Sequence, residues 1–446
     1  MSPDLFRLAS GLTVLHDRRP QHLTSTIGLF ILAGPVDEKP EAAGVAHLVE
    51  HMLLNGTETR SAEDVSRAFD LAGGHLQAFT AREHTCLFSR VLATETRPAI
   101  EVMLDLVMDP VFDPVLFERE KGIVAEESRL GADSPQRHVV DLGLLSLWPE
   151  SAFGRSILGL PECVADLTPA DARAFHATHY RPARIVAVVD SPLPAEEIRS
   201  YFETAAGHPG NWRAGGDGAP VPRIAPRTTP GIVVSRAATQ QVHLCLSFPA
   251  PALGDSQAEP VTILSTLLGG SVAGRLLRVL RREDGLVYFV STSFIPYTAG
   301  GVFQVYAGVT PSSVERVLCL CLRELSRIAR EAPSADELHR ARQRVKGALA
   351  SAQEQPGDRT TMTGKEQLLL GRIRDPVEVL RAYDAVTLDD LLGAARAMFR
   401  PELMACAAIG PVDWTLDDLA RFRTRLAEAL SAATGVAGID APGGQP

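Results

Sequence analysis

The sequence predicts an α+β protein built from two homologous halves, each a mostly antiparallel sheet packed with helices. Three observations support this. Strand-like and helix-like segments alternate without regular βαβ units, one sequence pattern occurs at the same point of each half, and a stretch rich in glycine and proline separates the two copies. The chain has 446 residues, which is enough for two or three domains with their own cores.

The first half mixes short β-prone runs with amphipathic helical segments. Its predicted elements are, in order, strands at 11–16 and 24–32, helices at 43–54 and 61–71, a strand pair within 75–92, and helices at 99–108 and 114–130. Ser61 is a typical N-cap, because its hydroxyl can accept a hydrogen bond from a backbone N–H of the first turn that has no partner within the helix.

An internal repeat relates the two halves. Residues 166–182 read DLTPADARAFHATHYRP, and residues 385–401 read AVTLDDLLGAARAMFRP. Both copies predict a helix that begins after a Thr N-cap, ends at an aromatic residue followed by Arg-Pro, and leads into a buried strand, at 185–189 and at 404–409. At a constant offset of 219, the matched pairs are Thr168 with Thr387, Asp171 with Asp390, and Tyr180 with Phe399.

Composition shifts divide the chain further. The stretch 205–231 is rich in glycine and proline and has no apolar periodicity, so it is typical of a linker. The last residues are rich in Gly, Ala and Pro, which is typical of a disordered end. The predicted segments are an N-terminal domain at 1–210, a linker at 211–230, a C-terminal domain at 231–430 and a disordered tail at 431–446.

Charge, hydropathy and cysteine usage restrict the classes of function that the sequence can have. The 54 acidic residues exceed the 44 basic ones, for a net charge of −10, which disfavours a non-specific nucleic-acid binder. No apolar run approaches the roughly 20 residues that span a bilayer, and the acidic N-terminus is unlike a signal peptide. The six cysteines form no CxxC pair, as expected of reduced thiols. We therefore expect a cytoplasmic protein without a nucleic-acid or membrane partner.

The strongest functional motif is His47-Leu48-Val49-Glu50-His51, an H-x-x-E-H sequence. On a helix, His47 and His51 project from one face, one turn apart. Two imidazoles suit a catalytic Zn²⁺, which usually has three protein ligands and an open position for water. Glu50 lies on the same face and is placed to take a proton from that water. The alternative is a chance match on a half-buried helix, so the third ligand is the test.

An acidic helical segment supplies candidates for that ligand. Residues 117–130 read FEREKGIVAEESRL and lie about 76 residues beyond the motif, which is itself followed by Gly56-Thr57. On these three features the chain resembles the pitrilysin/insulinase family of zinc metallopeptidases, and in particular its short, two-domain bacterial members. The resemblance covers about residues 5–415 and is most specific at the motif.

The resemblance implies a ligand set. The family's third ligand is a Glu at the position of Glu127, and a Glu seven residues earlier, here Glu120, supports the site from behind. Glu126 is the alternative ligand and points about 100° away on the same helix. For Glu118 and Glu126 a solvated helix face is the favoured interpretation. The second half has no metal motif at the equivalent offset, so one Zn²⁺ per chain is expected.

The segment after Gly73-Gly74 resembles the family's glycine-led N-A-[FY]-T strand, which pairs with an extended substrate peptide by β-augmentation. The residues that match are Gln77, Ala78, Phe79 and Thr80. Gln77 stands where Asn is usual, which keeps the amide but adds a methylene group. His75 and His84 flank the segment; their strand context and lack of paired spacing favour surface or substrate-facing positions.

In the second half, residues 281–288 read RREDGLVY and resemble the family's R-x-x-x-G-L-x-Y sequence. The resemblance implies that Arg281 and Tyr288 reach across to the zinc site. A guanidinium and a phenol can hold a peptide carbonyl and stabilise the oxyanion of the tetrahedral intermediate. Without the family, the same residues fit a basic helix end, a glycine C-cap and a strand.

The leading hypothesis is a zinc endopeptidase that hydrolyses small or unfolded peptides, with the two halves closing around the substrate as a clam-like chamber. The family's short members imply a homodimer or a heterodimer with a paralogous subunit. One alternative is a non-catalytic scaffold subunit of a heteromeric complex, which typically lacks a ligand or the base. Another is a metal-dependent hydrolase of a non-peptide amide.

Overall fold

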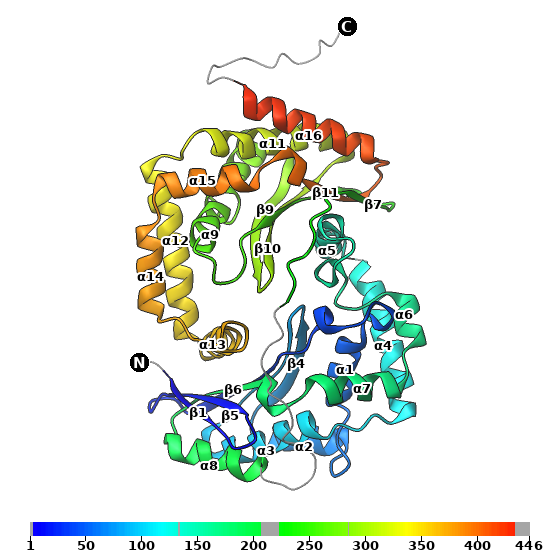
Figure 1. Ribbon diagram of the computed structural model, residues 1–446, viewed down its shortest axis with the longest axis vertical. Coiled ribbons are helices and arrows are strands. Elements are labelled where there is room, and N and C mark those ends of the chain that lie inside the picture. Colours follow the sequence, from blue (N-terminus) through cyan, green and yellow to red (C-terminus); the bar gives the residue numbers. More distant parts are fainter. Residues whose placement is uncertain (1–2, 133, 207–222, 284, 433–446) are drawn as a thin grey trace.

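The computed structural model describes residues 3–132, 134–206, 223–283 and 285–432 (Figure 1). The predicted tail from residue 433 on, and residues 211–222 of the predicted linker, lie outside this part of the chain.

The described residues form two mixed sheets, one in each half. The first has the order β1 (Asp4–Arg7), β2 (Thr13–Arg18), β6 (Ile185–Ser191), β3 (Thr24–Ile31), β5 (His84–Leu92) and β4 (His75–Ala81). The second has the order β7 (Ile232–Arg236), β11 (Ala405–Gly410), β8 (Val242–Ala250), β10 (Gly300–Val309) and β9 (Val287–Tyr297). Among the described strands only β2–β6 and β7–β11 pair in parallel, so the predicted α+β fold with mostly antiparallel sheets is confirmed.

Helices of each half cover one face of its sheet and close a hydrophobic core there. The helices of the first half are α1 (Val45–Leu53), α2 (Ala62–Leu71), α3 (Thr96–Met108), α4 (Pro114–Ala132), α5 (Pro135–Leu147), α6 (Pro161–Asp166), α7 (Pro169–His179) and α8 (Ala195–Ala206). Those of the second half are α9 (Ala258–Leu268), α10 (Arg275–Leu277), α11 (Val314–Arg330), α12 (Ala335–Glu354), α13 (Pro356–Leu370), α14 (Pro376–Ala385), α15 (Leu388–Met398) and α16 (Leu416–Ser431).

The internal repeat folds as its sequence predicts. Thr168 caps α7 and Thr387 caps α15, each accepting a hydrogen bond from the backbone N–H three residues on, at 3.3 and 3.2 Å. In both copies an Asp at that position bonds back to the cap, which completes a capping box. The buried strands β6 and β11 follow, so the two halves are homologous in structure as well as in sequence.

Two equivalent helices cross between the halves. Helix α5 of the first half packs on β8 and β11 of the second sheet, and α13 of the second half packs on β3 and β6 of the first (Figure 1). Val139 of α5 is buried in a cluster with Ile409, and Leu368 of α13 is buried in a cluster with Phe30. Each half therefore covers the open face of the other half's sheet.

A glycine stands at the contact of each crossing helix. A Cβ atom built on Gly143 of α5 would lie 2.7 Å from Cys245 Sγ and from Ser247 Oγ, and one on Gly364 of α13 would lie 2.2 Å from Phe30 Cε2. These distances are shorter than van der Waals contact, so both helices need the missing side chain to reach the opposite sheet.

We expect Gly364→Ala to lower the free energy of unfolding by about 1–3 kcal/mol, because the added methyl group must displace a fully buried ring. Urea unfolding followed by circular dichroism measures the change. The matched control is Gly347→Ala in α12, where no atom of the described residues other than the adjacent helix backbone and chain neighbours lies within 4 Å of the new Cβ. Helix propensity alone should make that variant more stable, by up to about 1 kcal/mol. Equal effects in both variants would contradict the close approach.

Candidate metal centre

Helix α1, which carries the H-x-x-E-H motif, is fixed at its N-terminus by Glu38. The first N–H groups of a helix have no partner within the helix. The Glu38 carboxylate accepts hydrogen bonds from Gly44 N at 3.0 Å and from Ala46 N at 2.8 Å. Burial raises the pKa of Glu38 to about 7, against these two backbone N–H groups, which favour the ionised form. The bond to Ala46 holds the backbone directly before His47.

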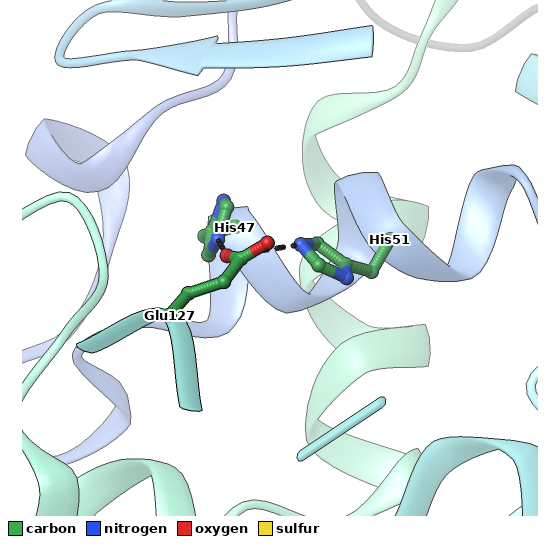
Figure 2. A group of neighbouring side chains, drawn as sticks. All are labelled: His47, His51 and Glu127. Carbon is green, nitrogen blue, oxygen red and sulfur yellow. Dashed lines mark hydrogen bonds and ion pairs between the residues drawn. The ribbon is translucent and has the colours of Figure 1, made fainter. Parts of the chain in front are cut away.

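The three predicted ligands lie together between α1 and α4 (Figure 2). Nε2 of His47 is 3.0 Å from Oε2 of Glu127, and Nε2 of His51 is 3.6 Å from the same oxygen. One ligand atom from each residue lies within 4.8 Å of the other two. The i, i+4 spacing on α1 and the folding of α4 alongside it therefore produce a compact group of two imidazoles and a carboxylate.

The donor set fits a zinc ion. Two His nitrogens and one Glu oxygen form a known type of catalytic zinc site, with a fourth position left for water or substrate. The imidazoles are mostly buried, whereas the Glu127 side chain is 41% exposed, which leaves one side of the group accessible to solvent. Since Nδ1 of His51 lies 3.0 Å from a carboxylate oxygen of Glu120, Nδ1 carries the proton in the neutral ring and Nε2 can bind a metal.

Glu120 orients the ring of His51 by holding Nδ1, the ring nitrogen that is not directed at Glu127. Its carboxylate also accepts a hydrogen bond from Nη2 of Arg119 at 2.9 Å. Burial raises the pKa of Glu120, but the donors His51, Arg119 and Asn55 outweigh it and lower the pKa below its ordinary value. Asn55 in turn donates to the backbone oxygen of His51 at 3.0 Å. An ionised Glu120 therefore holds one ring nitrogen of His51, while Asn55 holds its backbone.

Glu50 lies beside the group without belonging to the three ligands. Its Oε2 is 3.3 Å from Nδ1 of His47 and accepts a hydrogen bond from Oγ1 of Thr80 at 2.8 Å. Burial lowers the pKa of His47, but the carboxylates of Glu50 and Glu127 outweigh it and raise the pKa. The Glu50 side chain is only 8% exposed, so a nearly dry carboxylate stands next to the candidate metal position.

The other acids of α4 face solvent, as predicted. Glu126 pairs with Arg129 at 2.5 Å, and its side chain is 57% exposed. Glu118 pairs with Lys121 at 3.1 Å and is 66% exposed. Neither belongs to the His47–His51–Glu127 group.

Strand β4 is one of the two edge strands described in the first sheet, and it lies next to α1. Gln77 and Phe79 are exposed on one of its faces, whereas Ala78 packs against the core on the other face and Thr80 bonds Glu50. One edge of β4 is thus not paired within the sheet, as a peptide-binding strand requires.

The position predicted for His84 is wrong. His75 is exposed, but His84 is only 3% exposed and lies between the rings of Phe30 and Phe79, with centroids at 6.3 and 6.1 Å. Burial lowers the pKa of His84 to about 3. The ring is neutral at ordinary pH and packs between these two phenyl rings.

The second-half pair lies where the sequence predicts a helix end and a strand. Arg281 is exposed in the π-helix η6 (Arg278–Glu283), and Tyr288 is in β9. The side chain of Tyr288 lies outside the described part of the structure. The reach of both residues to the metal group stays a prediction.

Sequence reasoning missed Glu38, Asn55 and Arg119. Asn55 follows His51 by four residues, the same spacing as the two histidines, so it could have been placed on the metal-facing side of α1. Glu38 precedes α1 in the irregular segment around η1 (Pro35–Asp37), where no periodicity indicates a contact with a helix end. Among the described residues, no helix has the length and apolarity needed to span a bilayer.

A sheet-and-helix fold that occurs twice, with an H-x-x-E-H motif in the first copy, is typical of two-domain members of the class named for this inverted zinc-peptidase motif. The chain belongs to the insulinase family, peptidase family M16. The sequence model of that family matches residues 13–159. A second family model, described as "Peptidase M16 inactive domain", matches residues 166–345.

Several relatives carry zinc-protease names. An uncharacterized zinc protease of Streptomyces coelicolor is 32% identical over 417 residues, covering 91% of this chain and 89% of its own length. One of Bacillus subtilis is 28% identical and covers 90% of this chain and 97% of its own length. A structure titled as a peptidase M16 inactive domain from Pseudomonas fluorescens superposes with a TM-score of 0.85 at 19% identity, over 93% of this chain and all of the other.

Proposed function

We propose that this protein is a zinc-dependent endopeptidase. The proposal depends above all on one observation, the convergence of His47, His51 and Glu127 with the buried carboxylate of Glu50 beside them. The donor set is that of a catalytic zinc site, and the relatives named above as zinc proteases support the same chemistry.

The residues divide the work of peptide hydrolysis among them. A zinc ion, when bound, supplies Lewis acidity that polarises a peptide carbonyl and acidifies water. His47, His51 and Glu127 would hold the ion. Glu50 takes a proton from the attacking water and then passes it to the leaving amine. The hydroxyl of Thr80 keeps the Glu50 carboxylate oriented toward the site.

The substrate is an extended peptide. Its backbone pairs with the open edge of β4, along the residues Gln77, Ala78, Phe79 and Thr80. Arg281 and Tyr288 of the second half hold the scissile carbonyl and stabilise its developing negative charge. We propose that domains at 1–210 and 231–430 close around small or unfolded peptides, and that the protein works in the cytoplasm as a homodimer or beside a paralogous subunit.

Metal content and peptide cleavage test this function together. We expect one zinc per chain by plasma mass spectrometry, and cleavage of internally quenched peptides of unstructured sequence. A chelator should abolish the cleavage, and added zinc should restore it. Bound zinc without cleavage of a broad peptide library would favour a scaffold subunit instead. A purified protein that takes up no zinc would overturn the metal centre itself.

A further inference from the structure

The turn that joins β4 to β5 is buried, although two-residue hairpin turns usually lie in solvent. It consists of Arg82 and Glu83, which are 8% and 3% exposed. Charged side chains are almost never this buried unless they are paired. The tip of the hairpin that carries the candidate peptide-binding strand is therefore covered by other segments of the chain.

Glu83 finds its partners outside its own sheet. Its two carboxylate oxygens accept hydrogen bonds from the backbone N–H of Thr298, at 3.1 and 3.2 Å, and one of them also accepts from the Thr298 hydroxyl. Nη1 of Arg223 donates to the same carboxylate at 2.8 Å, and Nη2 donates to the backbone oxygen of Glu83 at 3.0 Å. Charge-assisted hydrogen bonds of this kind are the stronger ones.

Thr298 lies in the turn between β9 and β10, which is the second half's counterpart of the β4–β5 turn. Like β4, β9 is an edge strand of its sheet. The β4–β5 and β9–β10 hairpins, each at an edge of its sheet, thus meet tip to tip at one carboxylate. Arg82 secures the same tip, because it donates to Asp141 of α5 at 2.8 Å and to the backbone oxygen of Phe153 at 3.0 Å.

Both strands lead from this contact to residues of the proposed mechanism. Along β4, Thr80 stands three residues before Glu83 and bonds Glu50. Along β9, the chain runs back from Thr298 to Val287 and the neighbouring Tyr288. A shift at the tip would move the peptide-binding edge relative to the second half.

We propose that Glu83 is a positioning residue that fixes the strands β4 and β9 relative to each other, so that a peptide on β4 meets the groups of the second half. This inference rests on the proposed function. Every substrate needs the second half at its scissile carbonyl, but the effect is largest for long peptides. A short peptide on β4 can shift to meet a displaced second half, whereas a long peptide that extends beyond β4 has less freedom to do so.

The test compares Glu83→Gln, Glu83→Asp and the wild type with two quenched peptides, one of about seven residues, the length of β4, and one about twice as long. We expect Glu83→Gln to lower kcat/KM about 10- to 100-fold for the long peptide and by less than about threefold for the short one, with zinc content unchanged. Glu83→Asp keeps the charge and should restore part of the loss.

Asp190→Asn is the matched control. Asp190 is also a buried carboxylate that joins the halves, through an ion pair with Arg359 of α13. It lies in β6, however, which is separated from β4 by two other strands of the sheet. We expect this variant to change cleavage of both peptides by the same factor. Equal effects of Glu83→Gln on the two peptides, or no effect on either, would overturn the inference.

Amide hydrogen exchange tests this inference independently of whether the protein cleaves peptides. If the wild type cleaves neither peptide, the peptidase proposal fails, and the contact is judged by amide exchange alone. Faster exchange in both β4 and β9 of Glu83→Gln, absent in Asp190→Asn, would uphold the joint role of the hairpin tips. Unchanged exchange in the two strands would refute it.

Discussion

Replacement of Glu50 by Gln is expected to slow peptide cleavage by about 10²- to 10⁴-fold while zinc stays bound, because the change removes a general base but no ligand. Gln keeps the shape of the side chain and can still accept the hydrogen bond from Thr80. The measurement is kcat on a quenched peptide together with metal content by mass spectrometry.

The matched control for this variant is Glu118→Gln, an exposed Glu on α4 that pairs only with Lys121 among the contacts described. It should cleave like the wild type. Wild-type turnover by Glu50→Gln would remove Glu50 from the mechanism. Loss of zinc from Glu50→Gln would mean that its carboxylate is a ligand and that the arrangement around His47 has been assigned incorrectly.

Replacement of Glu127 by Gln is expected to weaken zinc affinity by more than about 100-fold, since even residues that only support a ligand contribute about 10- to 100-fold. Cleavage should fall in parallel at limiting zinc. The neutral amide oxygen is a weaker ligand than the carboxylate oxygen, which lies 3.0 Å from Nε2 of His47.

The neighbouring acid provides the control. Glu126→Gln should bind zinc as the wild type does, because its carboxylate points into solvent and pairs with Arg129. Competition with a chromophoric chelator measures both affinities. The opposite outcome, zinc lost from Glu126→Gln and kept by Glu127→Gln, would exchange the roles of the two residues and contradict the geometry of α4.

Local patterns predicted much of this molecule. The N-caps Ser61, Thr168 and Thr387 begin helices within one residue of the expected positions, because a hydroxyl followed by Asp three residues on satisfies the first N–H groups wherever the chain later packs. Helical periodicity likewise placed His47 and His51 on one face of α1.

Other features depend on contacts between segments far apart in sequence. The four residues of β1 (Asp4–Arg7) do not alternate between apolar and polar side chains, so their sequence does not predict a strand. Pairing with β2 stabilises the strand there. The burial of His84 involves Phe30 of β3, which lies far away in the sequence. The partners of Glu83 lie 140 and 215 residues away in the chain. No local pattern reports such distances.

The position of Glu127 combines both kinds of information. Its spacing from His51 is a family property, whereas the local sequence of α4 offers four acids and does not choose among them. The choice is made by the rotation of α4 against α1, where buried Phe117 and Val124 fix the helix face and turn Glu120 and Glu127 inward.

The crossing of α5 and α13 has an implication for the ancestry of the chain. Two identical copies of a single half, each lending a helix to the other, would form a domain-swapped pair with a twofold axis. Duplication and end-to-end fusion of one gene would convert that pair into a single polypeptide without breaking either crossing. The fused copies could then diverge, one keeping its ion-binding histidines while the other was retained for the surface it provides.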